Sequence, residues 1–158
     1  MIKLLGLDQC PPFYRDRVFL LAAAGGPMFW VAVALTTSLA PIPWARIWSL
    51  SFLVAAVLLP VIEEVCFRGL IQGEFIQCSW GRRAIHGVTL ANCATSVLFM
   101  AGHWLTHPPL WALSVIVPSI IFGLVRDRLQ STYPAIALHC FYNSGYFLFA
   151  GGGRIISG

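Results

Sequence analysis

The fold of this chain is decided by the stretch Ser49-Leu50-Ser51-Phe52-Leu53-Val54-Ala55-Ala56-Val57-Leu58-Leu59-Pro60-Val61-Ile62-Glu63-Glu64-Val65-Cys66-Phe67-Arg68-Gly69-Leu70-Ile71. It is apolar and uncharged up to Ile62, carries three ionisable side chains within the next six residues, and then becomes apolar again. Ionisable groups at membrane depth are costly, so they are rare there and are usually functional. The stretch therefore predicts a membrane-spanning helix that carries a functional site at Glu63, Glu64 and Arg68.

The composition of the whole chain agrees with a membrane location. Of its 158 residues, 58% are hydrophobic and 10% are charged, and the mean hydropathy is +0.79. Soluble domains usually carry roughly 25% charged residues. We therefore predict a single integral-membrane domain over residues 1–158, with the lipid bilayer as a partner. The 10 basic against 6 acidic residues indicate topology and lipid head groups, and no pattern typical of nucleic-acid binding is found.

Five apolar segments have about the length of 20 residues that a bilayer requires. We expect an all-α, polytopic helix bundle, with the functional motifs in a core of about residues 47–150. Gly25-Gly26-Pro27 predicts a kink or a close helix contact in the first segment, and Pro60 a tilt or a break in the second. The expected spans are about 18–40, 47–75, 88–106, 110–125 and 134–150.

The basic residues between these segments predict the orientation of the chain. With five crossings, seven basic residues fall on the side of the N-terminus and two, Arg46 and Arg154, fall on the other side. Positive residues are enriched in cytoplasmic loops. The N-terminus is therefore predicted to be cytoplasmic. The seven residues on its side are Lys3, Arg15, Arg17, Arg82, Arg83, Arg126 and Arg128.

The spacing within the acidic motif separates its two carboxylates. On a helix, Glu64 and Arg68 lie four residues apart on one face, where they can form an ion pair. Glu63 points about 100° away from Glu64, on a different face. A buried salt bridge that fixes helix packing would explain Glu64 and Arg68 but would leave Glu63 unexplained. We therefore expect Glu63 to be a general base or acid.

Two further polar pairs occur in later apolar segments. Phe99 and His103 lie four residues apart, as do His139 and Asn143. His139 and Asn143 can donate hydrogen bonds toward one point, as an oxyanion requires. Taken alone, each pair is equally explained by hydrogen bonding between membrane helices. Beside a buried glutamate pair, they form a carboxylate and imidazole set suited to activating a water molecule for hydrolysis.

The three motifs resemble, in order, those of the CPBP intramembrane proteases, which are the CAAX-processing and bacteriocin-processing glutamic endopeptidases. The sequence carries Glu63-Glu64-xxx-Arg68, Phe99-xxx-His103 and His139-xxx-Asn143. A lone EExxxR motif is weakly diagnostic, whereas three motifs in this order, each in an apolar segment, are strongly so. The resemblance extends from Glu63 to Asn143, about half of the chain.

The resemblance implies a role for each matching residue. Glu63 would activate water with help from His103, while His139 and Asn143 would stabilise the oxyanion. Glu64, Arg68 and Phe99 would support the site. The family also implies hydrolysis of a peptide bond without a metal or other cofactor.

The resemblance further implies a substrate that is a membrane-embedded or lipid-anchored protein or peptide. The chain is short for the family, and we expect no additional domain that selects a substrate. In this it is similar to dedicated bacterial processing enzymes that remove a C-terminal sorting tail or a leader peptide. The expected location is the bacterial inner membrane, crossed several times.

Two other interpretations use the same residues. His103, His139 and a glutamate form a legitimate zinc-ligand set, which would make the protein a metal-dependent membrane protease. Alternatively, His103 and His139 could ligate haem, or the glutamate pair could relay protons, in a membrane module without enzymatic activity. The haem interpretation leaves Asn143 and the glutamate pair without a role.

Overall fold

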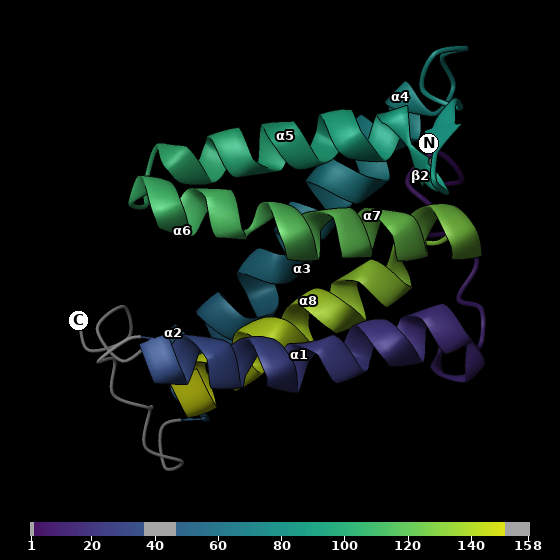
Figure 1. Cartoon of the computed structure of the whole chain (residues 1–158). Coiled ribbons are helices and arrows are strands. Elements are labelled where there is room, and N and C mark those ends of the chain that lie inside the picture. The colour runs from purple at the N-terminus through teal and green to yellow at the C-terminus, as the bar shows by residue number, and fades with distance from the viewer. Residues whose placement is uncertain (1, 37–46, 151–158) are drawn as a thin grey trace. The chain divides into compact units, whose positions relative to one another are not determined.

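The computed structural model describes residues 2–36 and 47–150, which are mostly helical (Figure 1). The end of the first predicted span, residues 37–40, lies outside the described residues, as do Arg46 and Arg154. The elements are η1 (Phe13–Arg15), α1 (Arg17–Thr36), α2 (Leu50–Leu53), η3 (Val54–Leu58), α3 (Leu59–Glu64), η4 (Val65–Ile71), α4 (Gln72–Phe75), β1 (Ala84–Ile85), β2 (Val88–Thr89), α5 (Leu90–Trp104), α6 (Pro109–Ser114), α7 (Ile116–Leu129), α8 (Tyr133–Gly145) and η5 (Tyr146–Ala150).

Three helices in the described part of the chain are long and apolar enough to cross a membrane. They are Arg17–Leu35, Leu50–Phe75 and Pro109–Leu129. These helices coincide with the first, second and fourth predicted spans. A helical membrane protein was predicted from the apolar segments, and this part of the prediction is confirmed.

The helix with the acidic pair runs over 26 residues from Leu50 to Phe75 and alternates between α-helical and π-helical turns. Ser49 caps its start, because the side chain accepts a hydrogen bond from the backbone N–H of Phe52. The sequence allowed a tilt or a break at Pro60, but the helix continues through this residue. The π-helical segment η3 precedes Pro60. A second π-helical segment, η4, follows Glu64 directly and contains Arg68. π-Helical turns of this kind are frequent at functional sites.

The chain divides into two compact units, and the three boundaries fall inside η1, α3 and α8. The first unit comprises residues 1–13 and 63–136. In it, α5 packs against α6 and α7 (Figure 1). A short hairpin, β1–β2, precedes α5 and was not predicted. His86 and Gly87 form its turn, both with positive φ, as a type I′ turn requires.

The second unit comprises residues 14–62 and 137–158. Here Tyr142, in the C-terminal part of α8, contacts α1. The Tyr142 hydroxyl donates to the carbonyl of Ala22, and its own carbonyl accepts from the indole N–H of Trp30. A methyl group at Gly25 would lie 2.9 Å from the Tyr142 hydroxyl. The close helix contact expected at Gly25-Gly26-Pro27 is therefore present.

An N-terminal segment belongs to the first unit and lies against the helix of the acidic motif. Leu5 lies against Gly69 and the carbonyl of Leu4 lies against Gly73. A methyl group at Gly73 would lie 2.6 Å from the Leu4 carbonyl oxygen and 3.4 Å from Nη2 of Arg126. Real Cβ atoms do not approach backbone so closely, so glycine is needed here to admit the segment.

We expect Gly73→Ala to destabilise the protein by about 1–3 kcal/mol, the usual cost of overpacking. Thermal unfolding of the purified protein in detergent would measure the loss. Gly102→Ala is the matched control, because a methyl group at Gly102 meets nothing within 4 Å and alanine favours a helix by up to about 1 kcal/mol. Equal melting temperatures for Gly73→Ala and wild type would contradict the close packing described above.

Candidate functional site

The acidic pair lies where α3 passes into η4, and its two carboxylates differ in burial. Glu64 is fully buried, whereas Glu63 is partly exposed. Glu64 Oε2 lies 3.3 Å from Nε of Arg68, and both side chains have no exposed surface. The ion pair predicted from the spacing of four residues is therefore confirmed. The two glutamates are in different environments, as their different helix faces indicated.

Arg68 is also held by the two helices packed against it. Its Nη2 donates to the carbonyl of Ser119 at 2.9 Å and to the Ser119 hydroxyl at 2.7 Å. Its guanidinium carbon lies 4.7 Å from the centroid of the Phe99 ring and 6.0 Å from that of Phe122. A cation over an aromatic face gains about 2 kcal/mol or more where water is excluded. Arg68 thus joins η4 to α5 and α7.

Phe99 and His103 share one face of α5, as their spacing predicted. Their ring centroids are 4.5 Å apart, so Phe99 contacts both the Arg68 guanidinium and the imidazole. Nδ1 of His103 lies 3.0 Å from the carbonyl oxygen of Phe99. A carbonyl can accept but not donate, so Nδ1 of the neutral ring carries the hydrogen and Nε2 carries the lone pair. The structure therefore makes Nε2 the basic atom of His103.

His139 and Asn143 lie one turn apart on α8, in the second unit. His139 is buried and Asn143 is partly buried. The side-chain Nδ2 of Asn143 donates to the carbonyl of Ala55 at 3.3 Å. The amide group has a second hydrogen on Nδ2, and the bond to Ala55 fixes the direction in which that hydrogen points.

The seven site residues predicted from sequence thus fall into two sets. The first unit joins the ion pair to Phe99 and His103 through direct contacts, and also contains Glu63. The second unit contains His139 and Asn143. The residues of the first set are Glu63, Glu64, Arg68, Phe99 and His103.

Sequence reasoning missed a polar stripe that extends the acidic motif. Gln72 follows Arg68 by four residues, is fully buried, and donates through Nε2 to the carbonyl of Gly123 at 3.1 Å. Glu64, Arg68 and Gln72 therefore repeat at a spacing of four, a signal that the sequence contains. Ser119 gave no comparable signal, because an isolated serine in an apolar span is not informative by itself.

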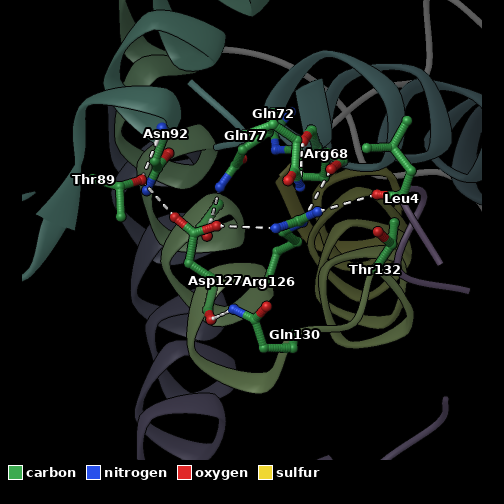
Figure 2. A network of polar contacts seen from close by, with 12 residues as sticks. Leu4, Arg68, Gln72, Gln77, Thr89, Asn92, Arg126, Asp127, Gln130 and Thr132 are labelled. Atoms are coloured by element: carbon green, nitrogen blue, oxygen red, sulfur yellow. Dashed lines mark hydrogen bonds and ion pairs between the residues drawn. The ribbon is translucent and has the colours of Figure 1, made fainter. Parts of the chain in front are cut away.

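Arg126 was counted among the basic residues of a cytoplasmic connection, but it lies inside α7 and is 4% exposed. Figure 2 shows its guanidinium between three acceptors. It donates to the carbonyls of Arg68 at 3.1 Å and Leu4 at 3.4 Å, and to Oδ1 of Asp127 at 3.3 Å. Its charge is therefore used to connect helices, and the sequence could not show this because its partners are mostly backbone carbonyls.

The turn between α7 and α8 binds the N-terminal segment in the same manner. The hydroxyls of Ser131 and Thr132 donate to the carbonyls of Gln9 and Leu5, at 2.8 and 2.7 Å. The backbone N–H of Thr132 donates to the carbonyl of Gly6 at 2.9 Å. Together with Arg126, these bonds hold residues 4–9 against the first unit through main-chain atoms.

Within the described part of the chain, no group of three or more His, Cys, Asp or Glu side chains is arranged to hold a metal ion. The zinc set considered from the sequence combines His103 and a glutamate of the first unit with His139 of the second. The haem interpretation likewise joins His103 to His139. Neither set is assembled within a single unit.

A family model described as "Rce1-like: type II CAAX prenyl endopeptidase Rce1-like" matches residues 43–145. The matched range is about two thirds of the chain and contains all seven predicted site residues. The resemblance to the CPBP proteases is thereby confirmed. No curated protein and no solved structure matches the chain. Residues 4–9, which bind beside Arg126, lie outside the matched range.

We expect Glu64→Leu to destabilise the protein by about 3–5 kcal/mol, because it leaves the buried Arg68 charge without its carboxylate. The double variant Glu64→Leu/Arg68→Met removes both charges and should recover much of that loss. The free energies of unfolding of the two single variants and the double variant in detergent, analysed as a double-mutant cycle, give the coupling. Additive losses would show that the pair is not coupled.

Proposed function

Because this chain belongs to the type II CAAX prenyl endopeptidase Rce1-like family, we propose that it is an intramembrane glutamic endopeptidase. The family match over all three motifs is the observation that carries the proposal. The substrate we propose is a membrane-embedded or lipid-anchored protein or peptide, from which the enzyme removes a C-terminal sorting tail or a leader peptide.

In the proposed reaction, Glu63 takes a proton from a water molecule whose oxygen attacks the peptide carbonyl carbon. His103 assists by accepting a hydrogen bond from that water through Nε2. The atom with the lone pair is set by the bond from Nδ1 to the Phe99 carbonyl, which supports this role. The proton held by Glu63 then passes to the leaving amine as the C–N bond breaks.

His139 and Asn143 stabilise the oxyanion that forms when water attacks. Preorganised donors aimed at developing charge contribute strongly to such reactions. Asn143 has an amide whose orientation is fixed by the Ala55 carbonyl, as a preorganised donor requires. We propose that these two residues act on the same peptide bond as Glu63 and His103. The motif order and the family membership support this assignment.

Glu64, Arg68 and Phe99 support this chemistry by holding the helices that carry it. Arg68 keeps η4 in contact with α5 and α7 through Glu64, Ser119 and the Phe99 ring. Phe99 in turn contacts the His103 ring. The position of His103 relative to the acidic motif therefore depends on Arg68.

We further propose that five helices cross the bacterial inner membrane, with the N-terminus in the cytoplasm, as one domain over residues 1–158. The two predicted spans beyond the three long apolar helices correspond to α5 and to α8 with η5. The excess of basic residues on the side of the N-terminus supports the orientation.

We expect Glu63→Gln to lower the rate of cleavage by at least about 100-fold, because the amide cannot take a proton from water. The assay is cleavage of a prenylated CAAX peptide by the protein reconstituted in lipid vesicles. Glu74→Gln is the matched control, because Glu74 is exposed in α4 of the same long helix. Full activity of Glu63→Gln would refute the proposed role of Glu63.

We also expect cleavage to persist in a strong chelator, and the purified active protein to contain no stoichiometric metal by elemental analysis. This result separates the glutamic mechanism from a zinc mechanism at His103, His139 and a glutamate. Loss of activity in the chelator that added zinc restores would favour the zinc mechanism instead.

A further inference from the structure

The proposed mechanism does not use His107, which follows the site residue His103 by four residues. Although α5 ends at Trp104, the backbone N–H of His107 donates to the carbonyl of His103 at 2.9 Å. This bond joins residues four apart, as in a helix, so His107 lies one turn beyond His103. The two ring centroids are 5.5 Å apart with 32° between the ring planes.

In each ring, Nδ1 already has a hydrogen-bond partner. Nδ1 of His103 donates to the Phe99 carbonyl, and Nδ1 of His107 lies 2.8 Å from the hydroxyl of Thr106. Nε2 is then the atom of each ring that can ligate an ion. Hydrogen bonding at the second ring nitrogen is also the usual way in which proteins orient a ligating histidine and raise its basicity.

The separation of the rings fits a shared ion. Zinc binds imidazole nitrogen at about 2.0–2.1 Å with tetrahedral geometry, which places the centroids of two ligating rings about 5–5.5 Å apart. The observed 5.5 Å lies at the upper end of this range. Two histidines four residues apart on a helix are a known arrangement for zinc ligands.

The surroundings restrict the rings while leaving them accessible. Both histidines are partly exposed. Phe99 contacts the His103 ring at 4.5 Å, and Trp111 stacks on the His107 ring at 6.5 Å. Since no group of three His, Cys, Asp or Glu residues is found in the described ranges, water would complete the coordination. An all-imidazole site of this kind favours Zn²⁺, Cu²⁺ or Ni²⁺ over Mg²⁺ or Ca²⁺.

We propose that His103 and His107 bind one divalent transition-metal ion together, and that the bound ion inhibits the peptidase. The binding part is argued from the separation of the two rings and from the partners of their Nδ1 atoms. The inhibition part rests on the proposed function, because the ion occupies Nε2 of His103, the atom that would otherwise accept a hydrogen bond from the attacking water. The site is thus inhibitory, and it shares His103 with the proposed catalytic residues.

Binding is tested with Zn²⁺ alone, by isothermal titration calorimetry of the full chain in detergent after the thiols have been alkylated. Wild type should bind one ion, and His107→Asn should bind it at least about tenfold more weakly, since one of two protein ligands is lost. His86→Asn is the matched control, because His86 lies in the hairpin turn with a positive φ that asparagine tolerates. Equal affinity of His107→Asn and wild type would overturn the proposal, as would an equal loss in His86→Asn.

The absorption spectrum of bound Co²⁺ provides a second readout of the same site. Nitrogen and oxygen ligation gives weak visible bands in wild type that should be lost in His107→Asn. Strong thiolate-to-metal bands would instead show that cysteines bind the ion, and would overturn the proposal.

Inhibition is tested with the vesicle cleavage assay. Wild type and His86→Asn should lose activity as Zn²⁺ is added, whereas His107→Asn should cleave normally without metal and resist the same concentrations. Unchanged inhibition of His107→Asn would place the inhibitory ion elsewhere and overturn the proposal. A wild type that binds zinc but does not cleave any membrane peptide would refute the proposed function while leaving the metal site confirmed.

Discussion

The buried guanidinium of Arg68 is the charge on which the packing of the first unit depends. Inside an apolar helix bundle, such a charge needs an opposite charge and hydrogen-bond acceptors. Its carboxylate comes from Glu64 one turn earlier, and its acceptors come from Ser119 on α7. The aromatic faces of Phe99 and Phe122 lie against its plane. Because these partners lie on three different helices, satisfying this one charge fixes how η4, α5 and α7 pack in the first unit.

A second arginine extends the same constraint toward the N-terminus. Arg126 donates to the backbone carbonyl of Arg68 and to that of Leu4. Asp127 beside it accepts from Thr89, the residue that caps the start of α5. Both arginines thus donate hydrogen bonds to main-chain carbonyls and form ion pairs with carboxylates, and these groups would otherwise be costly to bury. The N-terminal segment, outside the matched family range, is bound by this part of the first unit.

The Phe99 backbone and side chain link this framework to the imidazole. The ring contacts both Arg68 and His103, and the carbonyl fixes the tautomer of His103. The basic Nε2 atom is therefore a consequence of helix geometry, since a histidine bonds readily to the carbonyl four residues earlier. The same geometry places His107 one turn later, where a second imidazole adjoins the first.

The local spacing of residues was sufficient to predict much of the first unit. The pairing of Glu64 with Arg68 and the contact of Phe99 with His103 follow from a spacing of four on one helix. The close helix contact at Gly25 follows from small residues in an apolar segment. The partners of Arg68 on α7 and the burial of Arg126 could not be predicted, because they depend on which helices pack together.

The sequence by itself determined the membrane character, the helical class, the family and the ion pair within the acidic motif. These properties depend on composition and on spacing along one helix, and both are present in the chain before it folds. The tertiary structure alone decided that Ser119, Phe122 and Arg126 complete the environment of Arg68, and that glycine at position 73 admits the N-terminal segment. The physical reason is that most of these contacts join residues more than 50 positions apart, many through backbone carbonyls, which every residue has and which therefore leave no signal in the sequence.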